Sequence, residues 1–144
     1  MNEIEAAAQK LRTAIRLLHR RAWAVSGRNG PTRSEQGVMA WLDEKGALTP
    51  GTLADAEKVR PQTMGQTLEA LDRRRWILRR PHPDDRRQVL ITLSAAGRKA
   101  LYQNRKRRQA WLVGELRQLA PRELRTVIEA ADILDRIAQS PAGA

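Results

Sequence analysis

A change of apolar period halfway along the chain constrains the fold more than any other feature of this sequence. Before the change, apolar residues such as Met64, Leu68 and Leu71 recur every three or four positions, which is the spacing of one helix face. Over residues 88–93 they alternate instead, which is typical of a strand. The stretch from Pro81 to Arg87 holds two prolines and two aspartates, which favour a rigid, polar hairpin tip. A β-hairpin is therefore expected directly after a helix.

Helix-start patterns place two short helices before that hairpin. Thr49-Pro50 puts a capping residue before a proline at a first helical position, and Arg60-Pro61 repeats the proline signal. Upstream, Thr32 and Glu35 form a capping box that begins another helix. Two short helices joined by a tight turn and followed by a hairpin describe a winged helix-turn-helix, which we expect over residues 32–93. The predicted fold class is therefore mainly α with a small β-hairpin wing.

Long amphipathic helices are expected to flank this region. The apolar stripes of residues 3–25 and 122–138 both recur at near-heptad spacing, and Ser94 is expected to cap a long helix between them. Each stripe is narrow for the core of one chain, so we expect residues 1–30 and 98–140 to be dimerisation helices, although an intramolecular core would use the same pattern. The expected dimer-interface residues are Leu11, Ile15, Leu18, Leu124, Ile128 and Leu134. Residues 1–144 together are expected to form a single domain.

The charge balance indicates an acidic partner. Lysine and arginine total 27 against 16 aspartate and glutamate, a formal net charge of +11. Nucleic acid is the first candidate partner for such a chain, and an anionic membrane surface is the second. The longest uncharged stretch, Gln88 to Gly97, is shorter than the about twenty apolar residues of a membrane span, and the N-terminus lacks the apolar run of a secretory signal. We therefore expect a cytoplasmic protein with no membrane partner.

The residue inventory leaves little room for catalysis. With no cysteine and two histidines, the chain lacks disulfides, a thiol nucleophile and the ligand sets of the common zinc sites. Its serines stand in no nucleophile-elbow motif. The acidic pairs Asp43-Glu44 and Asp84-Asp85 are adjacent in sequence, so the two carboxylates of a pair do not face one another across a substrate. We expect no enzyme, no metal site and no cofactor.

Polar side chains on the helix that starts at Pro61 are the candidate base readers, because the second helix of this motif enters the major groove. Glutamine can bind adenine, and arginine guanine, through two hydrogen bonds, whereas threonine contacts a thymine methyl or a phosphate. From Lys58 to Arg87, nine basic residues stand against four acidic ones, and arginine at the hairpin tip suits a narrow minor groove. The alternative is an ordinary polar helix face. The candidate DNA contacts on this helix are Arg60, Gln62, Thr63, Gln66, Thr67 and Arg73.

The hairpin carries the run from Pro83 to Arg87, followed by Val89 to Ser94 and then Gly97. This run resembles the wing of the MarR family of bacterial transcriptional regulators, whose pattern is Asp-Pro-x-Asp-Arg-Arg, a short spacer, Leu-Thr and Gly. The order and length of the elements fit over essentially the whole chain. Two positions depart from the pattern, since His82 stands where the family usually has aspartate and Ser94 where it usually has threonine. The serine keeps a helix cap, whereas the histidine is expected to alter how the wing tip is braced.

The resemblance implies a homodimeric DNA-binding regulator, usually a repressor, on a pseudo-palindromic operator. Such a protein lies in the bacterial cytoplasm and is associated with the nucleoid when bound to DNA. The resemblance also implies that Arg87 enters the minor groove and that Asp85 braces it, and we expect Arg86 to probe the same groove. Many members release DNA when a small, often aromatic effector binds between the dimerisation helices and the DNA-binding lobe. Candidate effector contacts are Trp23 and Trp41, although packing in a core is the commoner role of tryptophan.

Two other functions use the same features. A nucleic-acid-packaging or RNA-binding protein would employ the positive charge without a preferred sequence, and its specific-to-nonspecific affinity ratio would stay below about tenfold. A pure interaction module would use the heptad stripes and bind no duplex at low salt.

Overall fold

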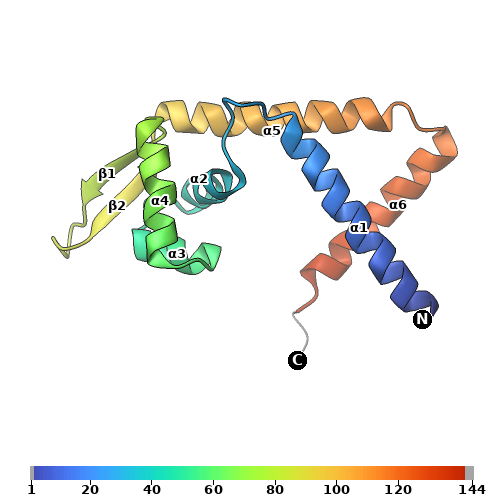
Figure 1. Cartoon of the computed structure of the whole chain (residues 1–144), viewed down its shortest axis with the longest axis horizontal. Coiled ribbons are helices and arrows are strands. Elements are labelled where there is room, and N and C mark those ends of the chain that lie inside the picture. Colours follow the sequence, from blue (N-terminus) through green and yellow to red (C-terminus); the bar gives the residue numbers. More distant parts are fainter. Residues whose placement is uncertain (1, 142–144) are drawn as a thin grey trace. The chain divides into compact units, whose positions relative to one another are not determined.

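The structure, a computed structural model, describes residues 2–141 as six helices and one antiparallel hairpin (Figure 1). This order confirms the predicted change from helix to hairpin and back to helix. None of the helices in the described range is long and apolar enough to cross a membrane. The elements are α1 (Glu3–Ala24), α2 (Arg33–Lys45), α3 (Pro50–Glu57), α4 (Pro61–Arg73), β1 (Ile77–Pro81), β2 (Val89–Leu93), α5 (Ala95–Leu116) and α6 (Pro121–Gln139).

Two compact units divide the chain between Arg108 and Gln109, inside α5. The first unit contains the elements from α1 to β2 and the first part of α5. The second contains the end of α5 and all of α6. Helix α5 runs through the boundary between the two units. The single-domain organisation of residues 1–144 stays a prediction, and the two units are described separately.

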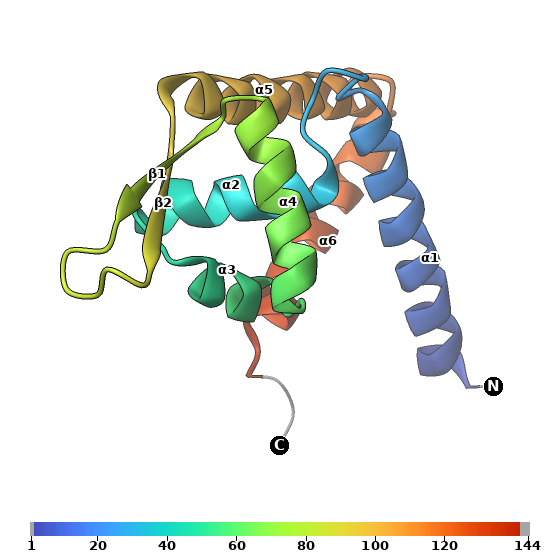
Figure 2. The same cartoon turned by 60° about the vertical axis from the view of Figure 1, so that its left-hand side comes forward.

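The core of the first unit lies between α2, α3, α4 and the hairpin, which contact one another (Figure 2). Met64, Leu68 and Leu71 supply one face of α4 to this core, as their spacing predicts. Leu101 adds a contact from the first part of α5. The core residues, each at most 7% exposed, are Val38, Met39, Leu42, Leu53, Ala54, Met64, Leu68, Leu71, Ile77, Ile91, Leu93 and Leu101.

The helix starts are formed as the sequence predicts. Thr32 Oγ1 accepts a hydrogen bond from the Glu35 amide at 3.2 Å, and Glu35 Oε1 accepts one from the Thr32 amide at 2.9 Å, which completes the capping box. Proline occupies the start of both α3 and α4. Between these helices Lys58 takes a left-handed φ of 56°, which lets the chain reverse within a tight turn.

The hairpin has a fixed register and a capped exit. Ile77 pairs with Leu93 at one end of the hairpin, and Pro81 pairs with Val89 at the other. The tip of the hairpin therefore lies between Pro81 and Val89. Leu48 adds one isolated antiparallel bridge to Ile91 of β2. At the exit, Ser94 Oγ accepts from the Gly97 amide at 3.0 Å and donates to the Arg75 carbonyl at 2.7 Å. Ser94 therefore caps α5, as predicted.

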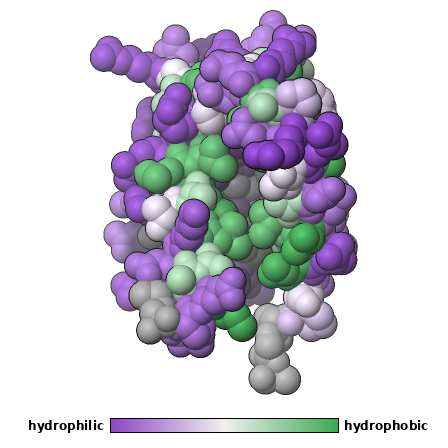
Figure 3. Space-filling model, turned by 90° about the vertical axis from the view of Figure 1, so that its right-hand side faces the viewer, coloured by the Kyte–Doolittle hydropathy of each residue, from purple (hydrophilic) through white to green (hydrophobic). Residues whose placement is uncertain are grey.

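The first and last helices leave their apolar residues exposed. Within the described residues, neither α1 nor α6 has a buried side chain. On α1, Ile15 and Leu18 are each 54% exposed, and on α6 Ile128 is exposed to the same extent. Hydrophobic atoms accordingly reach the surface in Figure 3. Burial of these stripes needs a partner surface beyond their own unit's core, so the dimer interface stays a prediction.

Candidate nucleic-acid interface

Helix α4 has one buried face and one polar face. Opposite its core residues, Gln62, Thr63 and Gln66 are exposed, whereas Thr67 is half-buried and donates its hydroxyl to the Thr63 carbonyl at 3.3 Å. Arg60 precedes the helix as an exposed N-cap residue whose side chain makes no capping hydrogen bond. The exposed amides and the Arg60 guanidinium thus occupy the end of α4 that the motif directs into a major groove.

The wing tip is organised around the Asp85 carboxylate. Its Oδ1 accepts from the Arg87 amide at 3.0 Å and from Arg87 Nε at 3.3 Å, while Oδ2 accepts from Gln88 Nε2 at 3.2 Å. These contacts, above all the Arg87 backbone N–H and then its guanidinium, hold the pKa of the Asp85 carboxyl below its usual range. The carboxylate therefore stays ionised at neutral pH. The Arg87 side chain is nevertheless 92% exposed, so its brace leaves it open to a ligand.

An ion pair joins the wing to helix α4. Arg79 on β1 donates from Nε to Asp72 Oδ2 at 2.9 Å, and its Nη2 lies 2.8 Å from the same oxygen. Asp72 lies on α4 one residue before Arg73, which is exposed and ends the helix. Arg79, Arg80 and Arg86 are all exposed, and Arg79 is in addition engaged in this ion pair.

Arg74 also makes contacts within the chain, although the sequence counts it among the basic residues around the wing. Its Nη1 donates to the carbonyls of Asn29 and Gly30 at 3.1 and 3.2 Å. Its Nε lies 3.1 Å from Oε2 of Glu35, close enough for an ion pair but not aligned as a hydrogen bond. The guanidinium also stacks 4.5 Å above the Trp76 ring. Sequence reasoning missed these contacts because all but that with Trp76 are distant in sequence.

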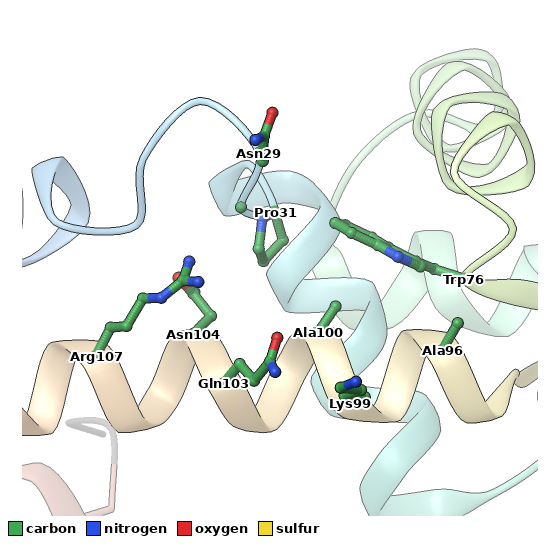
Figure 4. Close-up of a pocket in the computed structure, with 10 residues that line it drawn as sticks. Asn29, Pro31, Trp76, Ala96, Lys99, Ala100, Gln103, Asn104 and Arg107 are labelled. Atoms are coloured by element: carbon green, nitrogen blue, oxygen red, sulfur yellow. The ribbon is translucent and has the colours of Figure 1, made fainter.

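A small cavity adjoins this group of contacts. It has a volume of about 260 Å³ and lies between the loop before α2, the start of β1 and the first part of α5. Figure 4 shows the Trp76 ring reaching toward Pro31 above α5. Lys99 and Arg107 line the cavity and give it a positive charge. Asn104 also lines it and is 1% exposed, and its Oδ1 has no hydrogen-bond partner among the described residues.

Neither tryptophan predicted for the effector lines this cavity. Trp41 packs against the core of the first unit. Trp23 donates from Nε1 to His19 Nε2 at 2.6 Å, and the Arg108 guanidinium lies 4.7 Å above its ring. Trp76 lines the cavity instead, and no local sequence signal distinguishes it from the other tryptophans. An effector role for Trp23 and Trp41 stays a prediction, and the cavity does not support it.

Comparison with known proteins agrees with this arrangement. The model of the MarR family matches residues 32–89. An HTH-type transcriptional regulator of Mycobacterium leprae is 38% identical over 109 residues, which cover 75% of this chain and 76% of the relative. A transcriptional regulator structure from Pseudomonas aeruginosa is 30% identical with a TM-score of 0.85 and covers 96% of this chain and 98% of that chain. A MarR family protein from Bacillus stearothermophilus, 21% identical, covers 97% of this chain and 99% of that chain and shares the fold with a TM-score of 0.76.

The residues matched by the family model include the whole of α4 and the wing tip. The relatives are named for transcriptional regulation and not for catalysis. With its helix-turn-helix, its wing and these similarities, the chain belongs to the MarR family of winged-helix, DNA-binding transcriptional regulators.

Proposed function

We propose that this chain is a homodimeric repressor that binds a pseudo-palindromic operator in the bacterial cytoplasm. The observation that carries the proposal is the Arg87 guanidinium, which is braced by Asp85 and almost fully exposed at the tip of the wing. A fixed, exposed arginine suits the negative potential of a narrow minor groove. The Asp72–Arg79 bridge ties the same wing to α4, so both reading elements keep a defined relation.

Base recognition is assigned to the exposed end of α4. Gln62 and Gln66 offer the amide groups that bind adenine through two hydrogen bonds, and Arg60 offers the guanidinium that binds guanine. Thr63 and Thr67 complete the proposed set of base-reading residues on α4. Arg73 is proposed to contact the phosphates, and Arg86 is proposed to contact the minor groove. A mutant of Staphylococcus aureus MepR, which shares this fold at 18% identity and a TM-score of 0.71, has been solved bound to an oligodeoxyribonucleotide.

The effector is proposed to be a small aromatic acid that binds in the cavity of Figure 4. Trp76 offers an aromatic face, while Lys99 and Arg107 offer positive charge to a carboxylate. Asn104 Oδ1 is a buried acceptor that a hydroxyl or N–H of the ligand would satisfy. DNA binding by Bordetella bronchiseptica BpsR, which shares the fold at 20% identity and a TM-score of 0.59, is regulated by 6-hydroxynicotinic acid.

Loss of the wing arginine is the direct test of the proposed function. Arg87→Ala is expected to weaken operator binding by about 1–3 kcal/mol, or roughly five- to 150-fold, because a minor-groove contact is removed. Fluorescence anisotropy would follow titration of DNA from upstream of the chain's own gene, with a scrambled duplex alongside. Arg122→Ala on α6 makes the same change of charge outside the winged region and is expected to bind like the wild type. Unchanged affinity in Arg87→Ala would remove the wing from the mechanism, and equal wild-type binding of both duplexes would favour non-specific binding.

The proposed dimer makes a separate prediction. Ile15→Glu combined with Ile128→Glu is expected to give a folded monomer, because charges placed in the two exposed stripes oppose their burial against a second copy. Light scattering after size-exclusion chromatography would measure the mass. Leu78→Glu on β1 is a matched control, since Leu78 is 58% exposed and lies outside both stripes. A double variant that keeps the mass of a dimer would contradict the assignment of the interface.

A further inference from the structure

His82 occupies a structural position at the wing tip. Its Nδ1 accepts hydrogen bonds from two successive backbone amides, those of Asp84 at 3.1 Å and Asp85 at 3.2 Å. Its own amide donates to the Gln88 carbonyl at 3.2 Å, which closes the hairpin below the tip. The imidazole therefore holds the turn in the way that an aspartate or asparagine side chain holds an Asx turn.

This geometry determines the state of the ring. A nitrogen that accepts two N–H groups carries no proton, so this geometry requires the neutral form of the ring with its proton on Nε2. Protonation at Nδ1 would place an N–H opposite two other N–H donors, and both contacts would be lost. The brace therefore exists only while the ring is neutral.

The His82 ring supports the residue that braces Arg87. The Asp85 amide is held by the ring, while the Asp85 carboxylate holds Arg87 and Gln88. Loss of the ring contacts removes one of two holds on the backbone from which that carboxylate projects, because the Gln88 amide still donates to the Asp85 carbonyl at 3.0 Å. The chain of contacts thus runs from His82 through Asp85 to the exposed guanidinium.

We propose that His82 is a positioning residue for DNA binding, which holds the wing in its DNA-reading shape when neutral and releases it when protonated. The inference rests on the proposed function, because it assigns pH dependence to the same wing. The charged groups of the tip are Asp84, Asp85, Arg86 and Arg87. The start of α3 approaches the base of the wing through Thr49, Pro50 and Gly51, none of which titrates.

Two consequences of protonation can be separated. A new positive charge attracts any duplex, so it raises the affinity for a scrambled sequence as well as for the operator. Loss of the brace weakens only the binding that needs an ordered wing. The ratio of operator affinity to scrambled-duplex affinity therefore isolates the brace, and it is expected to fall as the pH falls.

The chain contains few side chains that could cause a pH dependence of the affinity ratio near neutral pH. The chain has two histidines and no cysteine, so few groups titrate between about pH 5.5 and pH 8. The pKa of His19 is lowered, first by burial and then by the charges of Arg33 and Arg108. Asp85 stays ionised over this range for the reason given above. His19→Gln therefore serves as the matched control for the other histidine.

The test compares four proteins at about pH 8 and about pH 5.5 by fluorescence anisotropy with operator and scrambled duplexes. For the wild type and His19→Gln, the affinity ratio is expected to fall about fivefold to tenfold at the lower pH, as expected for the loss of hydrogen bonds worth about 1 kcal/mol or slightly more. His82→Asp restores an acceptor that stays ionised, so its ratio should remain high at both pH values. His82→Ala should have the low ratio at both. A wild-type ratio in His82→Ala at the higher pH, or a pH-dependent ratio in His82→Asp, would overturn the proposal.

A second measurement needs no DNA. In ¹⁵N-resolved NMR of the free protein, the Asp84 and Asp85 amides should shift together with the protonation of the His82 ring, whose Nδ1 is unprotonated at the higher pH. Amide shifts that ignore the ring, or a proton on Nδ1 at that pH, would overturn the brace. Failure of the wild type to prefer its operator at either pH would instead refute the proposed function, so the two failures are distinguishable.

Discussion

Alanine in place of Gly97 is expected to lower the free energy of unfolding by about 3 kcal/mol, because a core contact would be overpacked. A Cβ at position 97 would lie 2.1 Å from the Trp76 carbonyl oxygen. That carbonyl is a fixed part of the fold, since it accepts from the Ser94 amide at 3.0 Å. The first turn of α5 therefore cannot accept a methyl group unless the helix shifts away from the start of β1.

Gly114 provides a matched control on the same helix. A Cβ there would meet no atom within 4 Å, so Gly114→Ala should stabilise the helix by about 0.5–1 kcal/mol. Urea titration followed by circular dichroism would measure both variants. Equal stability of Gly97→Ala and the wild type would show that α5 does not need this close approach. The close approach to the Trp76 carbonyl gives a physical reason for the glycine at position 97 of this chain.

The elements that could be predicted from the sequence depend on local signals. The capping box of Thr32 and Glu35 uses residues three apart, and the alternation of β2 is visible within five residues. Ser94 likewise caps a helix that begins at the next residue. Because backbone preference and near neighbours decide these features, the local sequence is sufficient to predict them.

The contacts that could not be predicted are tertiary. Arg74 and Arg79 have the same sequence signal as the other arginines near the wing, yet Glu35 and Asp72 engage them internally. The cavity beside Trp76 forms only when the loop before α2 meets α5. At His82 the departure from the family pattern was visible, but the nitrogen that accepts the two amides was not. Side-chain chemistry alone does not say which distant group will be adjacent.

Arg74→Met is expected to lower the free energy of unfolding by about 3 kcal/mol, because it leaves the Glu35 carboxylate buried without its cation. Glu35 is 2% exposed, and the Arg74 side chain is 29% exposed, so neither charged group is fully hydrated in the folded protein. The substitution also removes the hydrogen bonds to Asn29 and Gly30, which hold the loop at the cavity.

A double variant separates the buried charge from those other losses. Glu35→Gln keeps an acceptor for the Thr32 amide, so the capping box survives while the charge is removed. If the uncompensated carboxylate is the main cost, Arg74→Met with Glu35→Gln should be more stable than Arg74→Met alone by about 1–2 kcal/mol. Urea denaturation of the wild type, both single variants and the double variant closes the cycle. Additive effects would instead assign the loss to the loop hydrogen bonds and the Trp76 stacking, and would show that the Arg74–Glu35 ion pair contributes little to joining α4 to α2.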